Sequence, residues 1–218
     1  MMPSDPAAAP DPGEELEQRR QAIASGDPAL AMPALASLRE VSEAQATPLL
    51  LLGLEQGTFM IRSLACAGLG VKRSEAGWTA LEGVLGHDED ANVRAEAANA
   101  LASYGVQRAW PLLKAAFIAD GQWLVRCSIL SALAEQPEMA ASQLLELARL
   151  AIGDADGTVR VGGAEILGRL VREGGLNQAG DRQPLDQESA AAARALLVGL
   201  QSDGDHRVVA AALDGLQS

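Results

Sequence analysis

The sequence predicts an all-α protein, a right-handed solenoid of about five or six helix pairs. An Ile-Arg or Val-Arg pair recurs, and a leucine follows each arginine at one fixed interval. The arginines are 94 − 62 = 32, 126 − 94 = 32 and 160 − 126 = 34 residues apart. A fixed period of this size is the signature of stacked repeats. The repeats are Arg62 to Leu69, Arg94 to Leu101, Arg126 to Leu133 and Arg160 to Leu167.

Composition supports helices rather than sheets. Hydrophobic residues make up 48% of the 218 residues, whereas aromatic residues make up 3%. This pairing suits a core of alanine, leucine and valine in close-packed helices, because β-sheets favour aromatic and β-branched residues. On the second helix of the best-preserved repeat, Val93, Ala97, Leu101 and Tyr104 share one stripe at helical spacing.

The helices follow from periodicity and turn signals. Two opening helices are expected over about 14–25 and 29–40, separated by a turn in which Asp27 caps and Pro28 begins the second helix. Each later pair has a first helix, a short acidic loop and a second helix that carries the arginine. The first helices are expected over about 46–56, 76–86, 108–119, 141–152 and 188–201. The second helices are expected over about 59–69, 91–103, 123–135, 157–171 and 206–217.

Two stretches interrupt this order. Residues 1–12 contain four prolines among alanine and aspartate, which predicts a disordered tail. Residues 13–218 are then a single repeat domain. Within it, the glycines of residues 172–187 and Pro184 forbid a continuous helix, so this stretch is a loop insertion. Insertions in solenoids map to one face, often the binding face.

The net charge limits the classes of binding partner, and the cysteine content indicates the cellular compartment. The net charge of −12 would repel nucleic acid, and the sequence has no compensating basic patch. No apolar run approaches the roughly 20 residues of a membrane span. The sequence has two cysteines, which fits a reducing, cytoplasmic location.

The acidic loops are expected to stabilise the stack. Asp88, Asp120 and Asp154 each precede a repeat arginine by six residues. Acidic residues at the start of a helix cap its free N–H groups, as expected for Asp90 and Asp156. The arginines should then form a ladder within reach of these acids. We interpret this ladder of Arg62, Arg94, Arg126, Arg160, Asp88, Asp120 and Asp154 as structural rather than as an anion site.

The motif Asp-x-Asp-x-x-Val-Arg-x-x-x-Ala at residues 88–98, and its copy at 154–164, resembles short HEAT-like repeats of the phycobilisome lyase type. Those repeats occur in cyanobacterial bilin lyase subunits and phycobilisome degradation proteins. The resemblance covers roughly residues 45–217. It implies a cyanobacterial protein that binds phycobiliproteins or helps to assemble a photosynthetic complex.

The sequence gives little support for catalytic or metal-binding chemistry. Iron-dependent HEAT-repeat hydroxylases carry His-Glu pairs, but neither His87 nor His206 is followed by glutamate. No Ser-His-Asp arrangement, glycine-rich phosphate loop or HExxH motif is present, so we assign no catalytic residue, metal or cofactor. Cys66 and Cys127 lie two repeats apart, roughly 20 Å at about 10 Å per helix layer, too far for a disulfide or a shared metal site. We expect both to be small buried core residues.

Partner-binding residues should lie where the repeats differ. In such arrays the second helices line the concave face. The side chains two and five residues after each arginine should be exposed on this face. Trp78 and Trp110 occupy equivalent repeat positions and are expected to pack in the array. Phe59 and Trp123 begin second helices and are better candidates for contact. The partner-binding candidates are Phe59, Glu96, Asn99, Trp123, Ser128, Ser131 and Glu165.

The sequence therefore favours a non-enzymatic, protein-binding scaffold or adaptor. Its partner could be a phycobiliprotein or a photosynthetic complex subunit, toward which it would act as a chaperone or assembly factor. One alternative is a phycobilin lyase subunit that attaches or handles a bilin. Another is an iron–sulfur or iron-homeostasis factor that uses Cys66 or Cys127.

Overall fold

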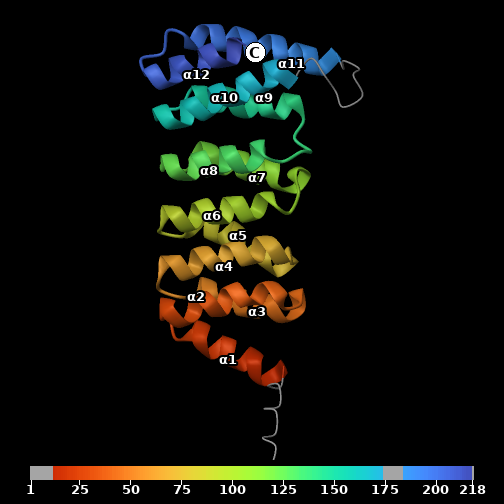
Figure 1. Cartoon of the computed structure of the whole chain (residues 1–218), viewed down its shortest axis with the longest axis vertical. Coiled ribbons are helices and arrows are strands. Elements are labelled where there is room, and N and C mark those ends of the chain that lie inside the picture. The colour runs from red at the N-terminus through yellow and green to blue at the C-terminus, as the bar shows by residue number, and fades with distance from the viewer. Residues whose placement is uncertain (1–11, 174–183, 218) are drawn as a thin grey trace, which may run out of the picture.

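The chain forms a single stack of helix pairs that runs from α1 to α12 (Figure 1). The structure, a computed structural model, describes residues 12–173 and 184–217. Across these residues the regular elements are helical, without a strand. They are α1 (Pro12–Ala24), α2 (Pro28–Ser37), η1 (Leu38–Glu40), α3 (Glu43–Leu54), α4 (Phe59–Lys72), α5 (Glu75–His87), α6 (Ala91–Ala102), α7 (Val106–Ala119), α8 (Trp123–Ala134), α9 (Ala141–Ile152), α10 (Gly157–Glu173), α11 (Pro184–Leu200) and α12 (His206–Leu216).

The predicted all-α solenoid is confirmed, with six helix pairs from α1/α2 to α11/α12. The predicted helices differ from the observed ones by a few residues at their ends, and α9 has the expected bounds. Most of the predicted tail lies outside the described residues, except Pro12, which opens α1. The predicted loop is shorter than residues 172–187, because α10 reaches Glu173 and α11 begins at Pro184. Residues 174–183 lie outside the described part of the chain.

Local signals determine where the helices begin. The side chain of Asp27 accepts a hydrogen bond from the backbone N–H of Ala29 at 2.9 Å, and Pro28 follows as the first helical residue. Asp90 and Asp156 cap α6 and α10 in the same way, as predicted. Each accepts from the backbone N–H two residues ahead, at 2.8 and 2.7 Å. These caps satisfy N–H groups that have no partner within the helix.

The core lies between the two helix layers, and small residues let consecutive second helices approach closely. Val93, Ala97 and Leu101 are completely buried, as predicted, while Tyr104 is half-buried at the end of their stripe. Where α4 passes α6, a Cβ atom added to Gly70 would lie 2.9 Å from the Cα of Ala100. The direct packing of second helices on one another therefore depends on glycine and alanine at the contact points.

The arginine ladder is present, but each arginine pairs with the acid of the next repeat. The sequence predicts arginines within reach of these aspartates but does not say which acid pairs with which arginine. Arg94 donates to the backbone C=O of Asp88 at 2.9 Å and to the carboxylate of Asp120 at 2.8 Å. The loop of the following pair lies beside Arg94 because the pairs stack in sequence. The other rungs are Arg62 to Asp88 at 2.8 Å, Arg126 to Asp154 at 2.6 Å and Arg160 to Asp203 at 3.0 Å.

Asp203 is a ladder residue that sequence reasoning missed. It lies 43 residues after Arg160, whereas the other rungs span 26 or 28 residues, since α11 and the segment before it intervene. A signal was present, because Asp203 precedes Val209 by 209 − 203 = 6 residues, as Asp88 precedes Arg94. Val209 takes the arginine position in the last pair. No later pair follows among the described residues to supply a carboxylate, and Arg207 instead pairs with Asp205 of its own helix start.

Candidate functional site

The surface formed by α4, α6, α8, α10 and α12, here called the second-helix face, carries most of the predicted partner-binding residues. Asn99 and Ser131 are exposed on α6 and α8, and Glu165 is exposed on α10. Glu96 and Ser128 are half-buried on the same face. The rule of two and five residues after the ladder arginine therefore places these side chains on one surface.

A groove of ≈ 410 Å³ between α6 and α8 brings three of the predicted residues together. Among the described residues, the side chains of Asn99, Ser128 and Ser131 form no hydrogen bond with the protein. They thus present an amide and two hydroxyl groups to solvent, where they can bond to another molecule. The groove is lined by Asn99, Cys127, Ser128, Ser131, Ala132, Glu135 and Gln136.

A second groove, of ≈ 510 Å³, lies between α10 and α12 and is charged. The predicted residue Glu165 lines it together with Arg172, His206, Arg207 and Asp214. Sequence reasoning did not find the α12 residues of this groove, because the degraded last repeat obscured their position. The two grooves are separated along the stack and differ in chemistry, since the first carries hydroxyl and amide groups and the second carries more charged side chains.

The aromatic residues differ in burial. Phe59 and Trp123 are the first residues of α4 and α8 and remain 41% and 46% exposed. They do not line the grooves described above. Trp78 is buried, with its ring 5.4 Å from that of Tyr104 and the guanidinium of Arg108 stacked 4.0 Å above it. Trp110 is half-buried. Among these four aromatic residues, Phe59 and Trp123 are therefore the exposed ones.

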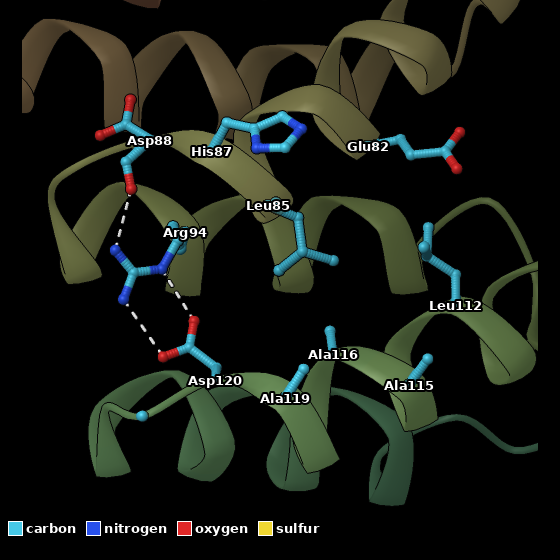
Figure 2. A pocket seen from close by; sticks show the side chains of 12 residues that line it. Glu82, Leu85, His87, Asp88, Arg94, Leu112, Ala115, Ala116, Ala119 and Asp120 are labelled. Atoms are coloured by element: carbon cyan, nitrogen blue, oxygen red, sulfur yellow. Dashed lines mark hydrogen bonds and ion pairs between the residues drawn. The ribbon is translucent and has the colours of Figure 1, made fainter.

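The opposite layer contains a groove of ≈ 470 Å³ between α5 and α7 that the sequence did not predict (Figure 2). Leu85, Leu112, Ala116 and Ala119 form its apolar wall. The ion pair between Arg94 and Asp120 closes one end. Both donor groups of Arg94 that face Asp120 are already engaged, so this guanidinium is not available to an anionic ligand. Small alanine side chains on α7 leave the space open, and they were the signal in the sequence.

The two cysteines differ, which corrects the expectation that both are buried. Cys66 is completely buried in α4, and burial, together with the nearby carboxylates of Glu96 and Asp88, raises the pKa of its thiol to about 12. Cys127 is half-buried in the groove between α6 and α8, and burial raises its pKa as well. Both thiols are free. Within the described ranges, no group of three or more His, Cys, Asp or Glu side chains could hold a metal ion.

A match to a family model supports the repeat architecture of the central helix pairs. Residues 47–134, from α3 to the end of α8, match the family of HEAT repeats. The solved structure of human deoxyhypusine hydroxylase in complex with glycerol is similar over 94% of this chain and 96% of that chain, with 15% identity and a TM-score of 0.47. No curated protein matches the sequence. None of the described helices has the length and apolar character needed to cross a membrane. The chain is thus an all-α solenoid of stacked helix pairs, of which residues 47–134 match the family of HEAT repeats.

Proposed function

We propose that this protein is a non-enzymatic scaffold that binds a protein partner along the second-helix face. The observation that carries the proposal is the contrast between the two parts of each repeat. The ladder arginine recurs in four repeats with the same hydrogen bonds. The outward-facing positions, by contrast, change from Asn99 to Ser131 to Glu165 along the stack. A constant frame with a variable surface is suited to recognition.

The groove between α6 and α8, here called the central groove, carries polar groups that could bind a partner. The free amide of Asn99 offers a donor and an acceptor, and the hydroxyls of Ser128 and Ser131 can serve as either. Backbone groups of a partner segment need partners of this kind when they leave water. The two exposed aromatic residues, Phe59 and Trp123, add candidate contact points at the helix starts, because aromatic side chains dominate interface energetics. The net charge of −12 argues against a nucleic-acid partner.

The identity of the partner is a finer proposal. The resemblance to phycobilisome lyase repeats makes a phycobiliprotein or another photosynthetic complex subunit the first partner to test. A bilin lyase subunit would in addition bind phycocyanobilin and shift its visible absorbance. An iron–sulfur role would have to use Cys127, because Cys66 is buried with a raised pKa. A cytoplasmic location is consistent with the two free thiols.

The test is capture of partners on the purified full chain, identification by mass spectrometry, and calorimetric titration with the recovered protein. Ser131→Arg places a large charged side chain in the central groove and should weaken binding about tenfold or more. Thr79→Arg, at an exposed site on α5, is the matched control and should bind like the wild type. Equal affinity of wild type and Ser131→Arg would exclude the central groove as the binding site. A visible absorbance shift with phycocyanobilin would favour the lyase alternative.

A further inference from the structure

A fourth groove, of ≈ 320 Å³, opens between α2 and α4 and is apolar. Leu35, Leu38 and Leu50 form its base, and Leu64 and Val71 line it from α4. Val71 is 57% exposed. This groove adjoins the second-helix face at its N-terminal end, but its lining differs from the polar lining of the groove between α6 and α8.

The apolar surface of α4 is not repeated on α6 and α8. Adding the repeat spacing of 32 residues to Val71 gives Ser103 on the end of α6, and adding it again gives Glu135 after α8. The same steps from Leu64 lead to Glu96 and Ser128. The equivalent positions of the next two repeats are therefore polar. A contiguous exposed apolar surface on one repeat indicates a place of contact.

The groove lies where the chain tightens after α2. Helix α2 ends at Ser37 and the chain continues as η1, whose Leu38 and Arg39 line the groove together with Val71 and Lys72 at the end of α4. On α4, Leu64, Gly68 and Val71 follow the i, i+4, i+7 spacing of one helix face, about 10 Å long at ~1.5 Å per residue. A groove of this shape between two helices suits the apolar face of a third helix.

The charges at the groove favour an acidic partner. Arg39 and Lys72 are the charged residues of its lining. The ammonium group of Lys72 donates to the backbone carbonyls of Arg39 and Val41 at 2.9 and 2.5 Å, which holds it at the end of the groove. Arg73 is exposed just beyond, and Glu40 is the neighbouring acid. This end is thus locally basic in a protein whose net charge is −12.

We propose that the groove between α2 and α4 binds an amphipathic helix of a partner protein, with its apolar side chains in the groove and its acidic residues toward Arg39 and Lys72. The proposal rests on the scaffold function and adds the chemistry of the partner segment. A second copy of this chain fits less well. A symmetric pair joined through this groove would bring like cations of the two copies together, which opposes association.

Fluorescence anisotropy with two labelled model helices tests the proposal on the full chain. The peptides share one leucine-rich face and carry either glutamates or lysines on the other. The acidic peptide should bind, and Val71→Asp should weaken it about tenfold or more by placing a charge in the apolar groove. Arg39→Glu should weaken it about fivefold by removing charge complementarity. Leu213→Asp, at a 43% exposed leucine on α12, is the matched control and should leave binding unchanged.

Three outcomes would overturn the proposal. Equal or tighter binding of the basic peptide removes the charge argument, and absence of binding by either peptide removes the groove as a helix site. Sedimentation velocity that detects a dimer of the wild type, lost in Val71→Asp, identifies a second copy as the occupant. If partner capture still depends on Ser131 while both peptides fail, the scaffold function stands and this proposal alone is wrong. Circular dichroism verifies that each variant is folded.

Discussion

Arg94 of α6 and Asp120, which follows α7 in the next helix pair, form a two-pronged ion pair with N–O distances of 2.8 and 3.1 Å. The side chains are 14% and 10% exposed. The same guanidinium donates to the backbone C=O of Asp88, and the carboxylate of Asp120 accepts the N–H of Gln122. One charge pair thus joins two successive loops and sets the register between two helix pairs.

Arg94→Ala should lower the free energy of unfolding by about 2–3 kcal/mol, because it leaves the largely buried carboxylate of Asp120 without its counter-charge. Urea unfolding followed by circular dichroism measures the change. Lys114→Ala is the control, since it removes a more exposed ion pair between successive pairs, to Glu146 at 2.8 Å. That loss should be about 0.2–1 kcal/mol. Similar losses for the two variants would show that the ladder is no more stabilising than an ordinary surface pair.

Stability should fall on acidification from pH 5 to pH 3. Burial opposes ionisation of Asp120, but hydrogen bonds from Arg94 and from the N–H of Gln122 outweigh it and leave its pKa below the ordinary value. The pKa of Asp154 is lowered in the same way by Arg126 and the N–H of Asp156. A carboxylate with a lowered folded-state pKa contributes stability above its unfolded pKa of about 3.9, and this is lost as the pH falls through the folded value.

The measurement is urea unfolding at pH values between 3 and 6, with Asp120→Asn as the comparison. This variant should be less stable at neutral pH and should show a smaller loss of stability on acidification, because one titrating group is gone. A wild-type free energy of unfolding that stays constant down to pH 3 would contradict the role of these carboxylates.

Gly70→Ala should destabilise the stack by about 1–3 kcal/mol, since the new methyl group overpacks the contact between α4 and α6. Its Cβ would meet the Cα and Cβ of Ala100 at 2.9 Å. Gly83→Ala in α5 is the matched control, because a Cβ there has no neighbour within 4 Å. It should stabilise the protein by about 0.5–1 kcal/mol through helix propensity. Thermal unfolding of both variants checks the prediction, and equal effects would refute the close-packing argument.

The two thiols should differ in reactivity. Cys127 lines a groove and should be alkylated by iodoacetamide at pH 8, although slowly, because burial raises its pKa. Cys66, completely buried with a pKa of about 12, should react at least about tenfold more slowly in the folded protein. Peptide mass spectrometry resolves the two sites, and labelling in urea provides the unfolded reference. Equal alkylation rates of the two cysteines in the folded protein would contradict the burial of Cys66, because α4 would then have to open often enough to expose it.

Local sequence patterns predict the helix caps and the residues that share one exposed face. Asp27, Asp90 and Asp156 were recognised as caps because capping depends on a helix start and its own next residues. The positions of Asn99, Ser131 and Glu165 on one face followed from counting along a helix, since 3.6 residues per turn fixes which side chains point the same way.

The partners of the ladder arginines were decided by tertiary structure. The sequence places Asp88 six residues before Arg94, but the carboxylate that Arg94 binds belongs to Asp120, because stacking brings the next loop alongside. Separation along the chain does not predict such contacts. Arg160 and Asp203, for example, form an ion pair although they are 43 residues apart. The grooves have the same origin. The sequence alone determined the repeat, the helices and their caps, whereas the grooves depend on the spaces left when helices and small side chains pack together.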